Sequence, residues 1–125
     1  METITLEPIR IFFCNINAEM GLKGHCHYAE VIIEWETIGE IGYPSFAHTN
    51  KEVRDFVQGL ELKGIKGTNE QVLRYIWDSL GNIDFEECEK YNGKFRLYSL
   101  TLKVMGVKDS NNHDDGFTTY KKTAR

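Results

Sequence analysis

The sequence predicts an α+β domain in which an antiparallel sheet carries two helices on one of its faces. Two patterns predict it: β-branched and aromatic stretches near both ends of the chain alternate with the period of strands, and two segments between them have helical apolar spacing. The 125 residues are enough for one hydrophobic core and too few for two. We therefore expect a single domain over residues 1–125 with the order β-β-α-α-β-β.

The first two strands are predicted from residues 9 to 35. Ile9–Asn17 is β-branched and aromatic and alternates loosely, with the odd-numbered residues on one side. Glu19–Gly24 holds two glycines and is expected to be a turn. In His27–Trp35 the odd-numbered residues form an apolar face and the even-numbered residues form a wetter one. The two strands are expected to pair antiparallel.

The first helix is predicted to start near Thr49, after a glycine-rich connection over Thr37–Ser45. Thr49 and Glu52 have capping-box spacing. In a capping box the hydroxyl of the first residue accepts from a free backbone N–H of the first turn, and the carboxylate three residues later accepts from the backbone N–H of the first residue. The apolar stripe that follows is Val53, Phe56, Val57 and Leu60.

The second helix is predicted more strongly, after a short loop over Leu60–Gly67. Thr68 and Gln71 repeat the capping box, and Gly81 stands where a left-handed helix end is favoured. The apolar stripe is Leu73, Ile76, Trp77 and Leu80.

The chain is expected to close with a second pair of strands. Glu86–Gly93 is acidic and turn-like, Lys94–Val107 is a long strand, and Asp109–Gly116 is a polar loop. Phe117–Lys121 is a short last strand, preceded by the hairpin-turn dipeptide Asp115-Gly116. One face of the long strand carries Tyr98, Leu100, Leu102 and Val104.

Composition disfavours several classes of protein. The net charge is −4 and the chain has no basic stripe, so we expect no nucleic-acid partner. The apolar runs Ile11–Cys14 and Val31–Ile33 are far shorter than the roughly 20 residues that a bilayer requires, so we expect no membrane span. Glu2, Glu7 and Arg10 interrupt the first stretch, so no secretory signal is expected either.

The three cysteines, Cys14, Cys26 and Cys88, are an odd number and lack CxxC spacing. We therefore expect no disulfide framework, with the thiols acting as small buried hydrophobic groups. A reducing cytoplasm is the expected location.

His25-Cys26-His27 is the first feature with chemical potential. Residues two apart on a strand project to the same side, roughly 6.5–7 Å apart, and two such imidazoles can share a zinc ion. Zinc also takes a third protein ligand, which the pair alone does not supply. The alternative is that His25 and His27 are polar residues at the mouth of a strand.

The segment His25–Val31 (HCHYAEV) resembles the His-Gly-His-aromatic strand opening of the 6-pyruvoyltetrahydropterin synthase family, which includes the bacterial 6-carboxytetrahydropterin synthases. Gly42–Ala47 is similar to that family's lead into its first helix, with Ser45 in place of an Asp. The resemblance, although patchy, covers most of residues 9–121.

Later segments resemble the family in the same order. Thr68–Gln71 and Tyr75–Asp78 resemble the Pro-Thr-x-Glu and Trp-Ile-Trp pieces of its second helix, and Tyr98–Ser110 resembles its closing strand. The fold that this implies is the tunnelling fold, a β-β-α-α-β-β subunit with an antiparallel sheet and two helices on one face.

The resemblance also implies chemistry, because family members are zinc-dependent lyases acting on 7,8-dihydroneopterin triphosphate. His25 and His27 match two zinc ligands, whereas the third ligand position falls at Asn17. The family's catalytic Cys falls at Gly21, and its Leu-Asp-His segment has no counterpart here. Asp109 stands where a Glu grips the pterin ring.

Two functions follow as hypotheses. In the first, the chain is a divergent family member, a zinc-holding homo-oligomer such as a hexamer, which binds a pterin or purine-like ligand through Asp109 or Glu70 and acts as a lyase if it is active. In the second, it is a catalytically inactive, small acidic binding or inhibitor protein, of the immunity type or phage-encoded, on this or another α+β fold. A chance resemblance of an unrelated α+β domain is the third alternative.

Overall fold

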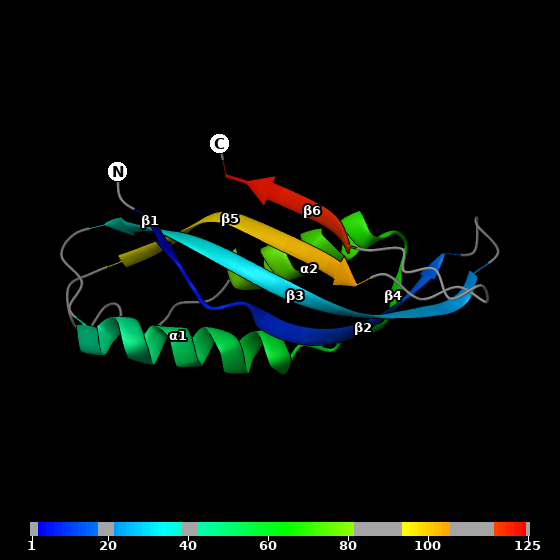
Figure 1. Ribbon diagram of the computed structural model, residues 1–125, viewed down its shortest axis with the longest axis horizontal. Helices are drawn as coiled ribbons and strands as arrows, with labels where there is room; N and C mark the ends of the chain where they lie inside the picture. The colour runs from blue at the N-terminus through cyan, green and yellow to red at the C-terminus, as the bar shows by residue number, and fades with distance from the viewer. Residues whose placement is uncertain (1–2, 18–21, 39–42, 82–93, 106–116, 125) are drawn as a thin grey trace.

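The computed structural model describes residues 3–17, 22–38, 43–81, 94–105 and 117–124. In these ranges the elements are β1 (Thr3–Thr5), β2 (Ile9–Asn17), β3 (Leu22–Ile38), α1 (Tyr43–Gln58), β4 (Lys63–Lys66), α2 (Asn69–Gly81), β5 (Lys94–Met105) and β6 (Phe117–Thr123). Figure 1 shows a long sheet with both helices on the same face. The predicted α+β class and the placement of the two helices are therefore confirmed.

The sheet is antiparallel apart from one short strand. Its order is β4-β2-β3-β5-β6, and β1 pairs with the far part of β3. β1, β2, β3, β5 and β6 pair antiparallel, whereas β4 runs parallel to β2. The end of β2, the start of β3 and the end of β5 therefore lie at one end of the sheet.

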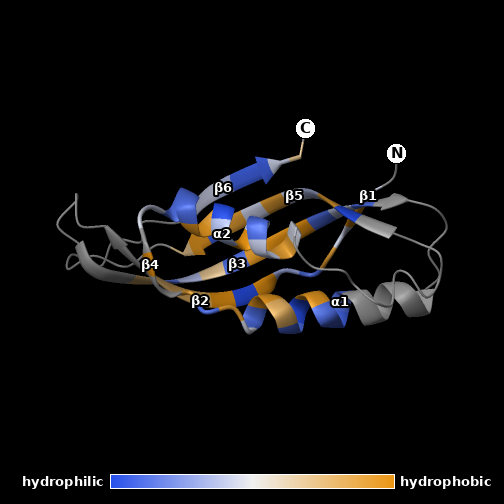
Figure 2. Cartoon of the chain, turned by 180° about the vertical axis from the view of Figure 1, so that it is seen from behind, coloured by the Kyte–Doolittle hydropathy of each residue, from blue (hydrophilic) through white to orange (hydrophobic). Residues whose placement is uncertain are grey.

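The core lies between the sheet and the two helices. Ala29, Val31, Ile33 and Trp35 on β3 are buried, as the alternation predicts. The other strands, both helices and the connections before β2 and β4 add to the same cluster Leu6, Ile9, Ile11, Phe13, Val53, Val57, Leu62, Val72, Leu73, Ile76, Leu80, Leu97, Leu100, Leu102 and Val104. Figure 2 shows hydrophobic residues on the strands and helices of this layer, whereas β6 is hydrophilic.

Helix α1 begins at Tyr43, six residues before the predicted start at Thr49. Pro44 lies in its first turn, where the missing N–H is not needed and the fixed φ suits the helix. Thr49 and Glu52 therefore lie inside the helix and do not cap it. Val53 and Val57 are fully buried and Phe56 is partly buried against the core, which confirms three residues of the apolar stripe, whereas Leu60 lies beyond the end of the helix.

Helix α2 begins as predicted. The Thr68 N–H donates to the Gln71 Oε1 over 2.8 Å, and the Thr68 carbonyl accepts from the N–H groups of Gln71 and Val72. Gly67, just before the cap, has a φ of 119°, a backbone conformation that favours glycine. The left-handed residue thus lies before this helix, and Gly81, where it was expected, is an ordinary helical residue.

The structure adds two strands that the sequence pattern did not predict, β1 and β4. It also extends β3 to Leu22–Ile38, and a register shift opposite Trp35 makes Leu97 rather than Tyr98 the buried residue at that point of β5. The segments Glu86–Gly93 and Asp109–Gly116 lie outside the described residues. No helix in the described ranges is both long and apolar enough to cross a membrane.

Two ion pairs differ sharply in burial. The Arg96 guanidinium lies 2.7 Å from the Glu36 carboxylate, directly across the β3–β5 ladder, and the Glu36 side chain is 1% exposed. The Arg54–Glu7 pair is 3.0 Å long, with side chains 40% and 78% exposed. Only the first pair neutralises a carboxylate that has been withdrawn from water.

The positive φ of Gly67 makes it the residue of this region least tolerant of a side chain. A Cβ at this position would overlap the Gln71 Oε1 that caps α2. We expect Gly67→Ala to lower the free energy of unfolding by about 1–3 kcal/mol in urea titrations. Gly81→Ala is the matched control, because a Cβ there meets nothing within 4 Å. This control should be neutral or stabilise by up to about 1 kcal/mol, and equal losses in both variants would contradict the argument.

Removing the charge of Arg96 should cost more than removing that of Arg54. Arg96→Met keeps the aliphatic stem but leaves the buried Glu36 carboxylate without this cation, so we expect a loss of about 2 kcal/mol in unfolding free energy. Arg54→Met breaks a solvated pair and should cost no more than about 0.5 kcal/mol. Thermal or urea unfolding compares the two variants. A larger loss of stability for Arg54→Met would refute the conclusion that the buried pair contributes more than the solvated one.

Candidate functional site

The candidate ligands on β2 and β3 lie at the end of the sheet where these strands join as a hairpin. The register pairs Phe13 with His27 and Asn15 with His25, and it becomes irregular between Asn15 and Asn17. Asn17, the position of the missing third histidine, is thus the last residue of β2. The hairpin brings these positions together, as the predicted antiparallel pairing requires.

Helix α2 starts at the same end because β4 carries the chain there. Ile16 of β2 pairs with Lys66 of β4, and α2 begins three residues later at Asn69. Glu70 is exposed in the first turn of this helix. The Asn69 Nδ2 donates to the Tyr120 hydroxyl over 3.2 Å, which links this turn to β6, the strand at the opposite edge of the sheet from β4.

His27 is half-buried on the face of β3 that the helices cover. Its ring centroid lies 5.4 Å from that of Phe13, which is fully buried. The aromatic contact restrains the imidazole at the border of the core. The imidazole of His27 is therefore held in place by its contact with Phe13.

The remaining candidate groups lie outside what the structure describes. This holds for Asp109 and for the side chains of Asn17 and His25. Within the described residues, no group of three His, Cys, Asp or Glu side chains is arranged to hold a metal ion. Since His25 is outside that set, the pairing of the two imidazoles stays a prediction.

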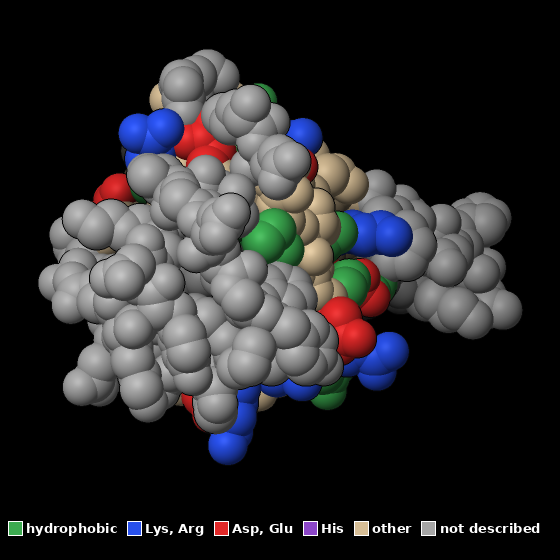
Figure 3. Space-filling view, turned by 90° about the vertical axis from the view of Figure 1, so that its left-hand side faces the viewer, with side chains coloured by type: hydrophobic (Ala, Val, Ile, Leu, Met, Phe, Trp, Pro, Cys, Tyr) green, Lys and Arg blue, Asp and Glu red, His purple; other side chains and the backbone are tan. Residues whose placement is uncertain are grey.

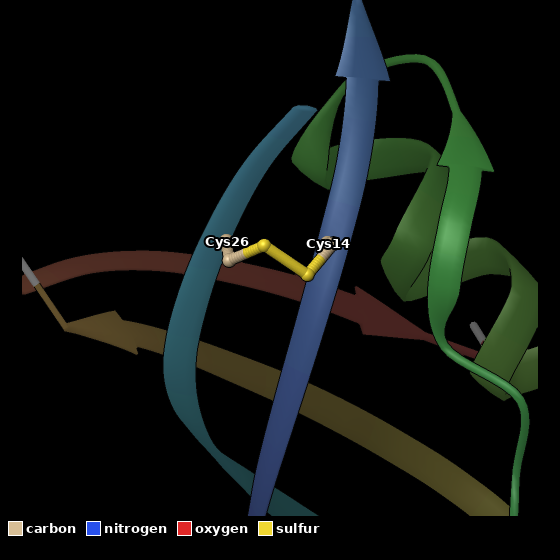
Figure 4. Close-up of a disulfide and its surroundings, with 2 residues drawn as sticks. All are labelled: Cys14 and Cys26. Carbon is tan, nitrogen blue, oxygen red and sulfur yellow. A yellow bond between two sulfur atoms is a disulfide. The ribbon is translucent and has the colours of Figure 1, made fainter. Parts of the chain in front are cut away.

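The expectation that the cysteines are separate buried thiols is wrong for two of them. Cys14 and Cys26 form a disulfide that joins β2 to β3, as Figure 4 shows, and Cys26 is exposed. The reason is the hairpin register, which places the two residues directly opposite each other. Cys88 lies outside the described residues. As expected, Cys26 projects to the face opposite His27, because side chains alternate along a strand.

The face of the sheet without helices also carries two exposed aromatic rings. Phe12 is 41% exposed and Tyr28 is 70% exposed, and their centroids lie 4.9 Å apart across the β2–β3 ladder. They are the next residues along this face from Cys14 and Cys26. Sequence reasoning missed this pair, although the opposite parity of Phe12 and the core residue Phe13 was visible in the pattern.

A shallow hollow of about 470 Å³ lies elsewhere, between the edge of β2 and the end of α1. Arg10, Phe12, Gln58 and Glu61 line it, and the Gln58 Nε2 donates to the Arg10 carbonyl over 3.4 Å. It does not include His27 or Glu70. The hollow is therefore separate from these two candidate residues.

At one end of the molecule the described charges of both signs are mixed. Figure 3 views the end of the molecule where β3 ends and β5 begins, and the described acidic and basic side chains there are interspersed. Among the described side chains of this end, neither sign of charge forms a field of its own.

The chain matches no protein-family model, no curated protein and no solved structure.

Proposed function

We propose that the chain is a divergent protein of the 6-pyruvoyltetrahydropterin synthase type, which holds zinc through His25 and His27 and binds a pterin or purine-like ring beside it. One observation supports the proposal: the backbone positions of Asn17, His25 and His27 lie near the hairpin end of β2 and β3, and β4, which pairs with the end of β2, leads into α2 with Glu70 in its first turn. A ring with N–H donors could be held there by a carboxylate acceptor.

The fold gives this proposal its second support. The strands β2, β3, β5 and β6 are neighbours in the sheet in the order of the chain. In the sequence, both helices come between β3 and β5. This is compatible with the tunnelling fold that we propose. The outer strands β4 and β6 have unpaired edges among the described residues, and association of copies through such edges would give the proposed homo-oligomer.

The donor set suits zinc in part. Imidazole nitrogens at residues 25 and 27 are typical zinc ligands, and His27 is already restrained by Phe13. The amide of Asn17 is a weaker third donor than the histidine of the family. When bound, zinc would polarise a substrate oxygen and ease removal of a nearby proton. The carboxylate of Glu70, and that of Asp109, would orient the ring.

A second function is favoured by the cysteines. Cys14 and Cys26 are joined to each other on the face opposite His27, so neither is a thiol beside the candidate zinc ligand. The family's nucleophilic Cys has no counterpart in the described residues. This supports binding without turnover, as in a small acidic inhibitor or immunity-type protein, and we propose the cytoplasm as its location.

Zinc content separates the two functions. We expect purified protein to carry stoichiometric zinc, measured by inductively coupled plasma mass spectrometry, and His25→Ala or His27→Ala to lose it. The reason is that neither imidazole alone supplies enough ligands to retain the ion. His48→Ala is the matched control, since His48 lies in α1 and belongs to no proposed site, and it should keep the metal.

The same samples should be measured by light scattering. Metal-free, strictly monomeric wild-type protein would overturn the first proposal, because both the zinc site and the assembly would be absent. Zinc retained by both histidine variants would overturn the ligand assignment alone.

Ligand binding should depend on the carboxylate of Glu70. We expect 7,8-dihydroneopterin triphosphate to bind in fluorescence titrations, and Glu70→Gln to weaken binding by about tenfold through loss of a charge-assisted hydrogen bond. Glu61→Gln is a matched control on a separate part of the surface. Binding without release of triphosphate would favour the inactive protein, whereas release of triphosphate would establish the lyase. No binding at all would contradict the proposed pterin ligand.

A further inference from the structure

The ladder between β2 and β3 holds Cys14 and Cys26 side by side independently of any bond between them. The Cys14 N–H donates to the Leu62 carbonyl on the β4 side over 3.0 Å, so it points away from β3. Cys14 and Cys26 therefore form a non-hydrogen-bonded pair, the type in which opposing side chains lie closest. Their Cα atoms are 4.0 Å apart.

The neighbouring pairs keep this arrangement in register. Phe13 pairs with His27 on one side and Asn15 pairs with His25 on the other. If the sulfur–sulfur bond opened, these backbone pairs would still hold the two thiols opposite each other. The geometry thus suits a bond that forms and breaks repeatedly in the folded protein.

The pair is also accessible. It lies on the face of the sheet that the helices leave uncovered, where Cys26 is exposed and Cys14 is half-buried. The adjacent Phe12–Tyr28 rings lie next to it on the same face and are exposed as well. A small thiol can therefore approach the sulfurs from solvent.

We propose that Cys14 and Cys26 are a redox-active pair that exchanges with small-molecule thiols and disulfides of the glutathione type. In reduction, one small thiol breaks the Cys14–Cys26 bond and forms a mixed disulfide. A second small thiol then releases the other cysteine. The two electrons and two protons come from the two small thiols, which leave as one small disulfide, and oxidation is the reverse.

Oxidation acts at a defined point of the fold. The bond crosses the ladder one residue pair before Asn15–His25 and the irregularity that follows it. In the oxidised protein the last regular pairs of the hairpin are covalently fixed, and in the reduced protein they depend on hydrogen bonds alone. A reversible bond is also the kind that cytoplasmic proteins use for redox sensing.

The test is a redox titration of the native, full-length protein. The protein is equilibrated without denaturant in mixtures of reduced and oxidised glutathione, quenched with acid, and labelled with a maleimide for intact-mass and peptide mass spectrometry. The chain has three cysteines, so the reduced form should take three labels and the oxidised form one, with Cys14 and Cys26 in the linked peptide. The melting temperature should be several degrees higher for the oxidised form.

Matched variants locate the effect. Cys88→Ser should leave the two-electron transition unchanged, whereas Cys14→Ser and Cys26→Ser should abolish it and its shift in melting temperature. Three labels at every glutathione ratio, a bond that resists reduction until the protein unfolds, or a linked peptide containing Cys88 would each overturn the proposal. The wild-type titration decides the matter even if a serine variant does not fold.

Discussion

The antiparallel register of β2 against β3 is the constraint on which the rest of the structure depends. Because side chains alternate along a strand, a shift by one residue would turn every side chain of β3 to the opposite face. Val31 and Ile33 would leave the core, and His27 would leave the ring of Phe13. The pairing of Cys14 with Cys26 would be lost in the same step. Core, candidate ligand and disulfide are thus consequences of one alignment of two strands.

The elements that could be predicted from the sequence are those whose pattern is set by burial. The alternation of β3 and the stripe of α2 reflect one buried face each, so they are visible in a single chain. The strand β4, Lys63–Lys66, is not, because two lysines and a glycine carry no apolar alternation and β2 supplies its pairing. The disulfide was missed for a related reason: the strands were predicted, but their register was not, because the pattern placed the turn at residues 19–24 whereas β3 already begins at Leu22.

The candidate site divides in the same way. His25 and His27 were visible because a spacing of two has a direct meaning on a strand. What the pattern could not indicate is where Glu70 lies relative to the hairpin. The parallel pairing of β4 with the end of β2 carries the chain to the hairpin, and α2 then begins with Glu70 in its first turn. The strand that sequence reasoning missed is therefore the element that leads the chain from the end of β2 to the helix that carries Glu70.

Alternation also separates two kinds of chemistry within one short segment. His27 lies on the helix-covered face beside Phe13, whereas Cys26, its neighbour in the chain, lies on the uncovered face in a disulfide. A regular strand keeps these side chains on opposite sides of the sheet, so a cysteine–histidine pair of the kind used in nucleophilic catalysis cannot form between them. The disulfide of this hairpin consequently lies on the uncovered face, and His27 lies on the face that the helices cover. This division is a physical reason for proposing ligand binding before turnover.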